Sequence, residues 1–285
     1  MNKRWIHLYI LALLLASLPC CVSAAEDDAD ALDEADPLVT DPEDDMTYIL
    51  LGLQADIDGC LRDLDSAVAG ASWKLSSTGL EGVRARGILD NLTAPNPKLQ
   101  DVVTMGPEGV ILAVEPSIYQ SAEGADISDQ EHIIKLMQTR NPVMSAIFPA
   151  VEGFDAISIA YPVFSSSGEF LGGISAILDP AEMLADLVET WVDGTGFGVT
   201  ITEKDGPILY DTDFNQIGKM PDDPLYQDYP ELLELIEQVM EERFGRESYS
   251  FLDPEENQTV KKVACWTTTG LHGREWRVAI TRMVE

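Results

Sequence analysis

Four phrases decide the fold of the segment Asn96–Pro180: GADISDQEHI (Gly124–Ile133), RNPVMSAIF (Arg140–Phe148), IAYPVFSSSGEFLGGI (Ile159–Ile174) and ILDP (Ile177–Pro180). Apolar runs rich in β-branched and aromatic residues alternate here with turns of Gly, Ser and Pro, a pattern typical of strands in an antiparallel sheet. The segment predicts two strands, a short polar helix and three further strands. These elements would form a small curved sheet with a pocket on one face.

The N-terminal residues have the pattern of an export signal. Lys3 and Arg4 precede an apolar run from Ile6 to Leu18, which is short for a membrane span, and small residues follow as far as Ala24 and Ala25. We therefore expect residues 1–25 to be a signal peptide and the rest to be extracellular or at the cell surface. Two alternatives stay open, an uncleaved N-terminal anchor and lipidation at Cys20 or Cys21. We expect no attached output module.

The charge balance is strongly acidic. The formal net charge is −32, and eleven acidic residues lie between Glu26 and Asp45 without a single basic residue. A phosphate backbone would be repelled by such a chain, so nucleic acid is excluded as a partner. Residues 26–45 cannot bury enough apolar surface to offset the entropy of ordering, so we interpret them as a disordered, solvated spacer.

A long helix is predicted next, over residues 46–95. Its apolar positions recur at steps of three and four residues: Leu50, Leu53, Ile57, Cys60, Leu64, Val68, Ala71 and Leu75. The glycines Gly79, Gly82 and Gly87 weaken its later part. This pattern indicates a helix that packs along one side on other elements.

The C-terminal third repeats the plan of the central segment. The stretch GTGFGVTITEKDGPILYDTD (Gly194–Asp213) predicts a strand, a turn and a strand, and EWRVAITR (Glu275–Arg282) a closing strand. Together with the four phrases above, these stretches resemble the double Cache family of extracellular sensor domains in chemoreceptors and sensor kinases. The resemblance covers about residues 46–285.

The resemblance implies an α+β fold in which a long N-terminal helix carries two PAS-like (Cache) lobes, each a curved antiparallel sheet with flanking helices. It implies a spine helix over 46–95, a membrane-distal lobe over 96–188 and a membrane-proximal lobe over 189–285. The family's spine packs against the proximal lobe, so Cys60 and Cys265, the two cysteines left after signal cleavage, are candidates for a disulfide in an oxidising exterior.

No catalytic arrangement is recognisable. The three histidines (His7, His132 and His272) lie in no triad context, and the cysteines lack the spacing of a zinc site. Asp211 and Asp213 are interpreted as turn-forming residues at a strand end rather than as an acid–base pair. We predict neither an enzyme nor a cofactor or metal site, although an unrecognised hydrolase remains the third alternative.

A ligand pocket is predicted in the distal lobe. Asp129 and His132 lie three residues apart on the expected helix, Arg140 lies in the following loop, and the remaining candidates are Met144, Ser145, Phe148, Tyr161, Phe164 and Ser175. Together they offer one cation, one anion and several hydroxyl groups within an apolar wall, a composition typical of a small-molecule site. Arg140 as a surface ion-pair residue and His132 as a solvent-facing residue are the alternatives.

The ligand class is narrowed by what the sequence lacks. In the amino-acid-binding branch of the family, an Arg-x-Trp-Tyr stretch and a strand Asp hold the ligand. This chain has SDQEHI at the helix and Ile177 where the Asp would align. We therefore expect a small polar metabolite other than an amino acid, and a carboxylate is one hypothesis for it.

Two classes of function remain after these observations. The first is a ligand-binding sensor domain that acts through a separate membrane signalling partner, and the second is a structural or adhesive surface domain without an exchangeable ligand. In either class, Asn91 and Asn257 stand in acceptor patterns for N-glycosylation (Asn91-Leu92-Thr93 and Asn257-Gln258-Thr259).

Overall fold

The computed structural model describes residues 42–151, 153–253 and 258–284. The predicted signal peptide and most of the predicted spacer lie outside these residues. The predicted spine forms two helices, α1 (Pro42–Thr78) and α2 (Gly82–Thr93). The break falls at Gly79, whose φ of +80° is a left-handed conformation that glycine adopts without strain. All the predicted stripe residues are buried except Cys60, which is half-buried.

We call the lobe built on the first sheet the distal lobe and the lobe built on the second sheet the proximal lobe, after the predicted domains. The strands of the first sheet are β1 (Asp101–Met105), β2 (Ile111–Glu115), β3 (Val143–Met144), β4 (Phe148–Pro149), β5 (Asp155–Phe164) and β6 (Phe170–Leu178). They pair antiparallel in the order β2-β1-β6-β5-β3, and β4 pairs with β5. The 3-10 helix η1 (Ser117–Ala122) follows β2, and α3 (Glu131–Thr139) precedes β3.

The second sheet forms the proximal lobe and has the same antiparallel strand order, β8-β7-β11-β10-β9. Its strands are β7 (Gly198–Glu203), β8 (Ile208–Asp211), β9 (Gly245–Asp253), β10 (Gln258–Leu271) and β11 (Arg274–Val284). Helix α4 (Pro180–Val192) precedes this lobe, and the 3-10 helices η2 (Phe214–Gln216) and η3 (Pro224–Tyr226) lead to α5 (Pro230–Glu241). The predicted α+β fold with two similar lobes is therefore confirmed.

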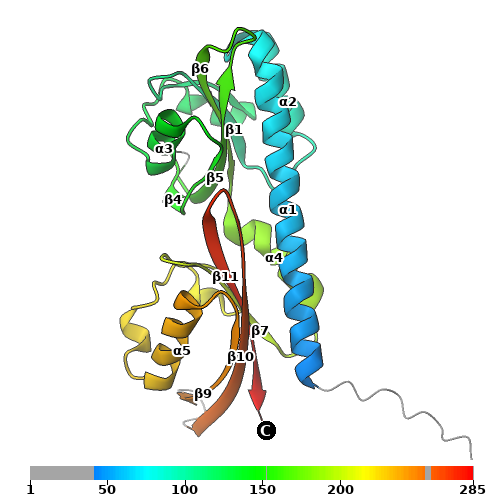
Figure 1. Cartoon of the computed structure of the whole chain (residues 1–285), viewed down its shortest axis with the longest axis vertical. Coiled ribbons are helices and arrows are strands. Elements are labelled where there is room, and N and C mark those ends of the chain that lie inside the picture. The colour runs from blue at the N-terminus through cyan, green and yellow to red at the C-terminus, as the bar shows by residue number, and fades with distance from the viewer. Residues whose placement is uncertain (1–41, 152, 254–257, 285) are drawn as a thin grey trace, which may run out of the picture. The chain divides into compact units, whose positions relative to one another are not determined.

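Each sheet has two differently covered faces (Figure 1). The main apolar core joins α1, α2 and α4 to one face of both sheets. A separate apolar cluster lies between the distal sheet and α3, and another between the proximal sheet and α5. The faces under α3 and α5 are thus independent of the spine, and each is a place where a site can be built.

Two boundaries differ from the sequence prediction. The strand expected over Val143–Phe148 is split into β3 and β4, because the Ser145 hydroxyl accepts the Ser158 backbone N–H (2.8 Å) in place of a regular ladder. The helix α3 begins at Glu131 with Gln130 as its N-cap, so Asp129 lies in the loop before it. Asp129 and His132 therefore do not share a helix face.

The predicted Cys60–Cys265 disulfide is wrong, because Cys60 is a free thiol. The register of α1 along β10 gives the reason. Gln54 donates to the Thr268 carbonyl oxygen (2.8 Å), and Asp58 accepts from the hydroxyl of Thr269. Cys265 lies four residues before Thr269, about 13 Å along the strand, whereas disulfides need Cα atoms within about 7 Å.

The glycosylation sites stay predictions. Asn91 lies exposed near the end of α2, and Asn257 lies outside the described residues.

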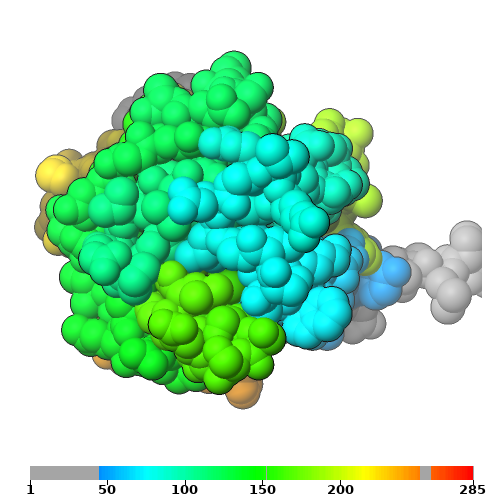
Figure 2. All heavy atoms as spheres, turned by 90° about the horizontal axis from the view of Figure 1, so that it is seen from above, coloured from blue at the N-terminus to red at the C-terminus, as the bar shows by residue number. Residues whose placement is uncertain are grey.

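In the view from above, the cyan residues of α1 and α2 lie beside the green residues of the distal lobe (Figure 2). Among the described residues, no helix has the length and apolarity needed to cross a membrane.

Candidate functional site

The distal sheet places polar side chains on the face that α3 covers. In β5 and β6 the residues alternate between faces, so that Ile157 and Ile159 join the spine core while Ala160 joins the cluster under α3. By the same alternation, Ser158 and Ser175 face α3. Asp101, fully buried in β1 opposite Ile177, lies on this face as well.

Three serines form a buried hydrogen-bonded group on this face. The hydroxyls of Ser158 and Ser175 lie 2.6 Å apart, and the Ser145 hydroxyl accepts the Ser158 backbone N–H at 2.8 Å. Each of the three residues is at most 1% exposed. Buried hydroxyls in the middle of a sheet weaken its apolar core, so their gathering in one place marks a polar site.

His132 stands over this group at the start of α3. It is 5% exposed, and its ring centroid lies 4.6 Å from that of Phe148. Burial, with a smaller contribution from the positive charge of Arg274, lowers the pKa of His132 from 6.5 to about 4. The imidazole is therefore neutral near pH 7, and it makes no hydrogen bond with any residue that the structure describes.

Two cavities meet at His132. The outer one has a volume of about 300 Å³ and is lined by Asp129–His132 and Ala146–Pro149. The inner one is a void of about 20 Å³, roughly the space of one water molecule, between His132, Phe148, Ser175 and Ile177. Gln130, His132 and Phe148 line both, so these side chains separate the hollow from the polar sheet face.

The structure brings together five of the nine predicted ligand residues: Asp129, His132, Ser145, Phe148 and Ser175. The other four lie elsewhere. Met144 joins the spine core, and the Tyr161 hydroxyl donates to Asp65 of α1 (2.8 Å), on the opposite face of the sheet. Arg140 and Phe164 meet at Phe170, where the Arg140 guanidinium carbon lies 4.8 Å from the ring centroid and the two phenylalanine rings lie 5.6 Å apart.

Sequence reasoning missed Asp101, Gln130 and Ser158. Strand alternation puts Ser158 and Tyr161, which are three residues apart, on opposite faces, so a predicted pocket that included Tyr161 excluded Ser158. Ser158 pairs with Ile177 and therefore lies diagonally beside Ser175. The sequence alone does not give this register between β5 and β6.

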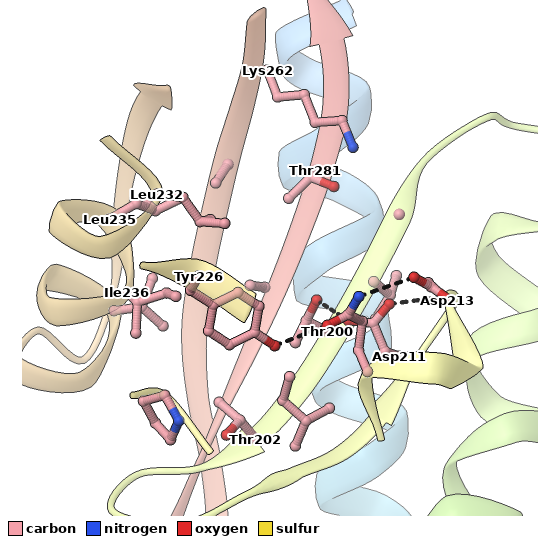
Figure 3. Close-up of a pocket in the computed structure, with 18 of the residues that line it drawn as sticks. Thr200, Thr202, Asp211, Asp213, Tyr226, Leu232, Leu235, Ile236, Lys262 and Thr281 are labelled. Atoms are coloured by element: carbon pink, nitrogen blue, oxygen red, sulfur yellow. Dashed lines mark hydrogen bonds between the residues drawn. The ribbon is translucent and has the colours of Figure 1, made fainter. Parts of the chain in front are cut away.

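The proximal lobe contains a larger cavity, of about 380 Å³, that the sequence did not predict (Figure 3). It lies between α5 and the sheet, with apolar side chains of α5 on one side and Thr200, Asp211 and Tyr226 on the other. Asp211 is 8% exposed, and its carboxylate accepts hydrogen bonds from the Thr200 hydroxyl (2.6 Å) and the Asp213 backbone N–H (2.8 Å).

The two aspartates of this region have different roles. Asp213 is exposed and caps η2 by accepting from the backbone N–H of Asn215 (3.1 Å), as expected for a turn-forming residue. Asp211 is instead a buried member of the cavity wall. Burial raises its pKa from 3.8 to about 6, against the opposing effect of the Thr200 and Asp213 hydrogen bonds.

The described residues contain no group of three or more His, Cys, Asp or Glu side chains that could hold a metal ion. The polar groups of the distal hollow include a neutral imidazole and the carboxylates of Asp129 and Glu131, and those of the proximal cavity include hydroxyls, the carboxylates of Asp211 and Asp213 and the ammonium of Lys262. Such groups are suited to recognising a small molecule by hydrogen bonds and charge.

Comparison with known proteins agrees with this geometry. Residues 59–180 match the family model described as the HK/GC/Chemotaxis protein-like sensor domain. No curated protein matches the chain by sequence. The matched residues comprise the later part of the spine and the whole distal sheet.

Several solved structures share the fold. An extracellular ligand-binding receptor from Desulfohalobium retbaense is 30% identical over 83% of this chain, with a TM-score of 0.71, and the chain spans 40% of that receptor. The ligand-binding domain of the Pseudomonas aeruginosa chemoreceptor PctC, solved with GABA, is 16% identical over 85% of this chain and 100% of its own, with a TM-score of 0.62. That of the Pseudomonas fluorescens chemoreceptor CtaA, solved with L-serine, is 15% identical over 85% of this chain and 98% of its own, with a TM-score of 0.60.

These relatives are receptor domains rather than members of an enzyme class. The described part of the chain has the double Cache fold of these sensor domains, and its residues 59–180 are similar to the HK/GC/Chemotaxis protein-like sensor domains.

Proposed function

We propose that this protein is an extracytoplasmic sensor domain that binds a small polar metabolite in its distal lobe, between α3 and the sheet. It passes the change in shape on to a separate membrane signalling partner. The ligand contacts are His132, Gln130 and Asp129 from the α3 side and Ser145, Ser158 and Ser175 from the sheet. Phe148 forms the apolar wall.

One observation carries this proposal. A neutral, buried imidazole without a hydrogen-bond partner among the described residues stands above a cluster of three buried hydroxyls, next to a hollow of about 300 Å³. A ligand in the hollow that supplies a hydrogen bond to a ring nitrogen of His132 gains about 0.5–1.5 kcal/mol from it, which adds to the affinity of the site.

A carboxylate is the ligand class that we favour. GABA and L-serine, named with the PctC and CtaA domains, both carry a carboxylate. Here the cation available near His132 is Arg274, whose guanidinium lies 3.5 Å from Glu131 at the start of α3. A carboxylate against His132 would also favour the protonated imidazole, so its binding is expected to take up a proton.

A thermal-shift screen of organic acids, amino acids, amines and nucleobases tests the proposal. A ligand at one hundred times its dissociation constant stabilises the protein by about 2.7 kcal/mol. If no compound stabilises the protein, the alternative of a structural or adhesive surface domain is supported instead.

Variants then locate the site of any stabilising compound. His132→Phe keeps an aromatic ring and removes both ring nitrogens, and Ser175→Val removes one hydroxyl; each is expected to weaken binding at least tenfold by isothermal titration. Ser248→Val, the same replacement in the exposed part of β9, is the matched control and leaves the affinity unchanged. A larger loss in Arg140→Ala than in His132→Phe would place the ligand at the Phe170 end of the lobe and contradict the proposed site.

A further inference from the structure

The cavity of the proximal lobe arises from small residues on the sheet. On the face under α5, neighbouring strands pair Thr200 with Ala279, Ala264 with Thr281, and Thr281 with Gly198. All of these residues are small, so they leave space between the sheet and α5. The space of about 380 Å³ above them falls in the size range of small-molecule sites.

The other wall is apolar and held in place. Leu232, Leu235 and Ile236 of α5 face the cavity (Figure 3), and Val239 of the same helix lines it as well. Arg277, only 1% exposed, donates from Nε to the Val239 carbonyl oxygen (2.8 Å) and from a terminal nitrogen to that of Met240 (3.2 Å). These bonds satisfy carbonyl groups at the end of α5 and fix its distance from the sheet, so the cavity is not closed by a small shift of the helix.

The polar end of the cavity is the carboxylate of Asp211. The Thr200 hydroxyl binds one of its oxygens and the Asp213 backbone N–H binds the other, which orients the carboxylate. Each carboxylate oxygen accepts two hydrogen bonds, so one lone pair on each stays available. Nearby, the Tyr226 hydroxyl donates to the Gln216 side-chain oxygen (2.9 Å).

The charges around Asp211 leave this end of the cavity negative. Asp213 lies beside it, Lys262 of β10 lies further along the wall with Thr281 between them in the view of Figure 3, and Tyr210, Tyr226 and Tyr249 are neutral at pH 7. The attraction of Lys262 is the smallest of the named influences on Asp211. Two carboxylates and one ammonium therefore line the site, and the buried charge is negative.

We propose that this cavity is a second binding site, which takes a small primary amine with an apolar body, the ammonium against Asp211 and the apolar part against α5. The ammonium supplies the donors that the carboxylate lacks, and the hydrocarbon part covers the leucine and isoleucine side chains. This site is separate from the distal one, and its existence does not depend on what the distal lobe binds.

The pH dependence follows from the same geometry. An ammonium favours the ionised carboxylate, so the amine and a proton compete for Asp211. With a pKa of about 6 in the free protein, Asp211 is mostly ionised at pH 7.5 and mostly protonated at pH 5. The dissociation constant for the amine is therefore expected to rise about tenfold between pH 7.5 and pH 5.

Three probes of similar shape test the chemistry by isothermal titration of the full chain: phenethylamine, phenylethanol and phenylpropionate. Phenethylamine is expected to bind at pH 7.5. Phenylethanol keeps the ring without the charge and is expected to bind at least tenfold more weakly, and phenylpropionate reverses the charge and is expected not to bind.

Two variants locate the amine. Asp211→Asn keeps the size of the side chain and is expected to weaken phenethylamine binding at least tenfold and to remove the pH dependence. Ala279→Leu fills the cavity from the sheet and is expected to abolish binding, with circular dichroism to confirm the fold. Asp205→Asn, the same replacement at an exposed position in the turn between β7 and β8, is the matched control and leaves phenethylamine binding unchanged; His132→Phe shows whether the amine binds in the distal lobe instead.

The proposal is overturned if phenethylamine fails to bind the wild type at millimolar concentration, if Asp211→Asn binds it as well as the wild type does, or if phenylpropionate binds more tightly. Loss of binding in His132→Phe alone would assign the amine to the distal site. The test of the distal lobe is read separately, from Ser175→Val and from the compounds of the screen other than amines.

Discussion

The two lobes share one strand order, but the sheet faces that lie away from the spine carry different side chains. Under α3, the distal lobe buries three serines, Asp101 and a neutral histidine; of these, His132 and Ser175 line a void of about 20 Å³, and His132 also lines the hollow of about 300 Å³. Under α5, the proximal sheet has small residues and one buried carboxyl group along a cavity of about 380 Å³. The backbone plan therefore does not determine which lobe can receive a ligand, and side chains on the face away from the spine do.

This difference in side chains affects how each lobe would gain binding free energy from a ligand. A site built mainly from polar groups needs a ligand that replaces water and completes hydrogen bonds, which favours selectivity for one small molecule. A roomier apolar cavity gains mainly from burial of hydrocarbon, about 25 cal/mol per Å², and tolerates variation in the ligand. We expect narrow specificity in the distal lobe and broad specificity in the proximal lobe.

The largest expected effect concerns the distal sheet itself. Gly172 has a φ of +136°, and a Cβ atom at this position would lie 2.1 Å from the Met105 carbonyl oxygen. Gly172→Ala should therefore separate β6 from β1 and cost roughly 3 kcal/mol or more of unfolding free energy. Gly168→Ala, in the hairpin turn with a positive φ but open space, is the matched control and should cost only about 1 kcal/mol. Equal losses in urea denaturation would show that the close approach of the strands is unimportant.

The two lobes should also respond to acid in opposite directions. The pKa of His132 is about 4 in the folded state against 6.5 when unfolded, so the unfolded state binds more protons between these values and stability is lost as the pH falls. His132→Phe removes this loss. Relative to the wild type, the variant should gain about 3 kcal/mol of stability between pH 7 and pH 4.

Asp211 changes the stability with pH in the opposite direction to His132. Its pKa is about 6 in the folded state against 3.8 when unfolded, so the folded state binds more protons and stability is lost as the pH rises through this window. Relative to the wild type, Asp211→Asn should therefore lose about 2 kcal/mol between pH 7 and pH 4. Urea denaturation of both variants at several pH values checks the signs. Parallel curves for the wild type and either variant would mean that the group does not titrate in this window.

The same comparison shows what the sequence could predict. The spacing of Leu53, Ile57, Leu64 and Val68 predicted the spine, because a helix that packs along its whole length must repeat its apolar residues. The repeat of strand and turn patterns predicted two lobes. These features are periodic, so they are visible without knowledge of tertiary contacts.

The site was only half predictable, for reasons of register and packing. Tyr161 and Ser175 lie on opposite faces of the sheet, and the sequence does not state how β5 is aligned with β6. The proximal cavity stayed hidden because Ala264 and Ala279 look like ordinary strand residues. Only their alignment beneath α5 makes a cavity.

The smallest expected effect concerns the contact through which the lobes meet the spine. Asp65 of α1 accepts from the Tyr161 hydroxyl of the distal sheet (2.8 Å) and lies 2.6 Å from Nε2 of His272, at the tip of the β10–β11 hairpin. The Tyr161 and His272 ring centroids lie 5.8 Å apart. Tyr161→Phe removes one hydrogen bond while the ring and its contact with His272 stay, so the unfolding free energy should fall by about 1 kcal/mol.

Asp65→Asn separates the hydrogen bond from the charge, because the variant keeps an acceptor for the Tyr161 hydroxyl and removes the carboxylate charge of Asp65. If the contact connects the lobes, a distal ligand should protect the amides of Leu271–Arg274 from hydrogen exchange in the wild type and protect them less in Tyr161→Phe. His132→Phe, which is designed to prevent distal binding, gives the baseline. Equal protection in the wild type and Tyr161→Phe would show that the Asp65 contact is only a local support, and that the two lobes respond independently.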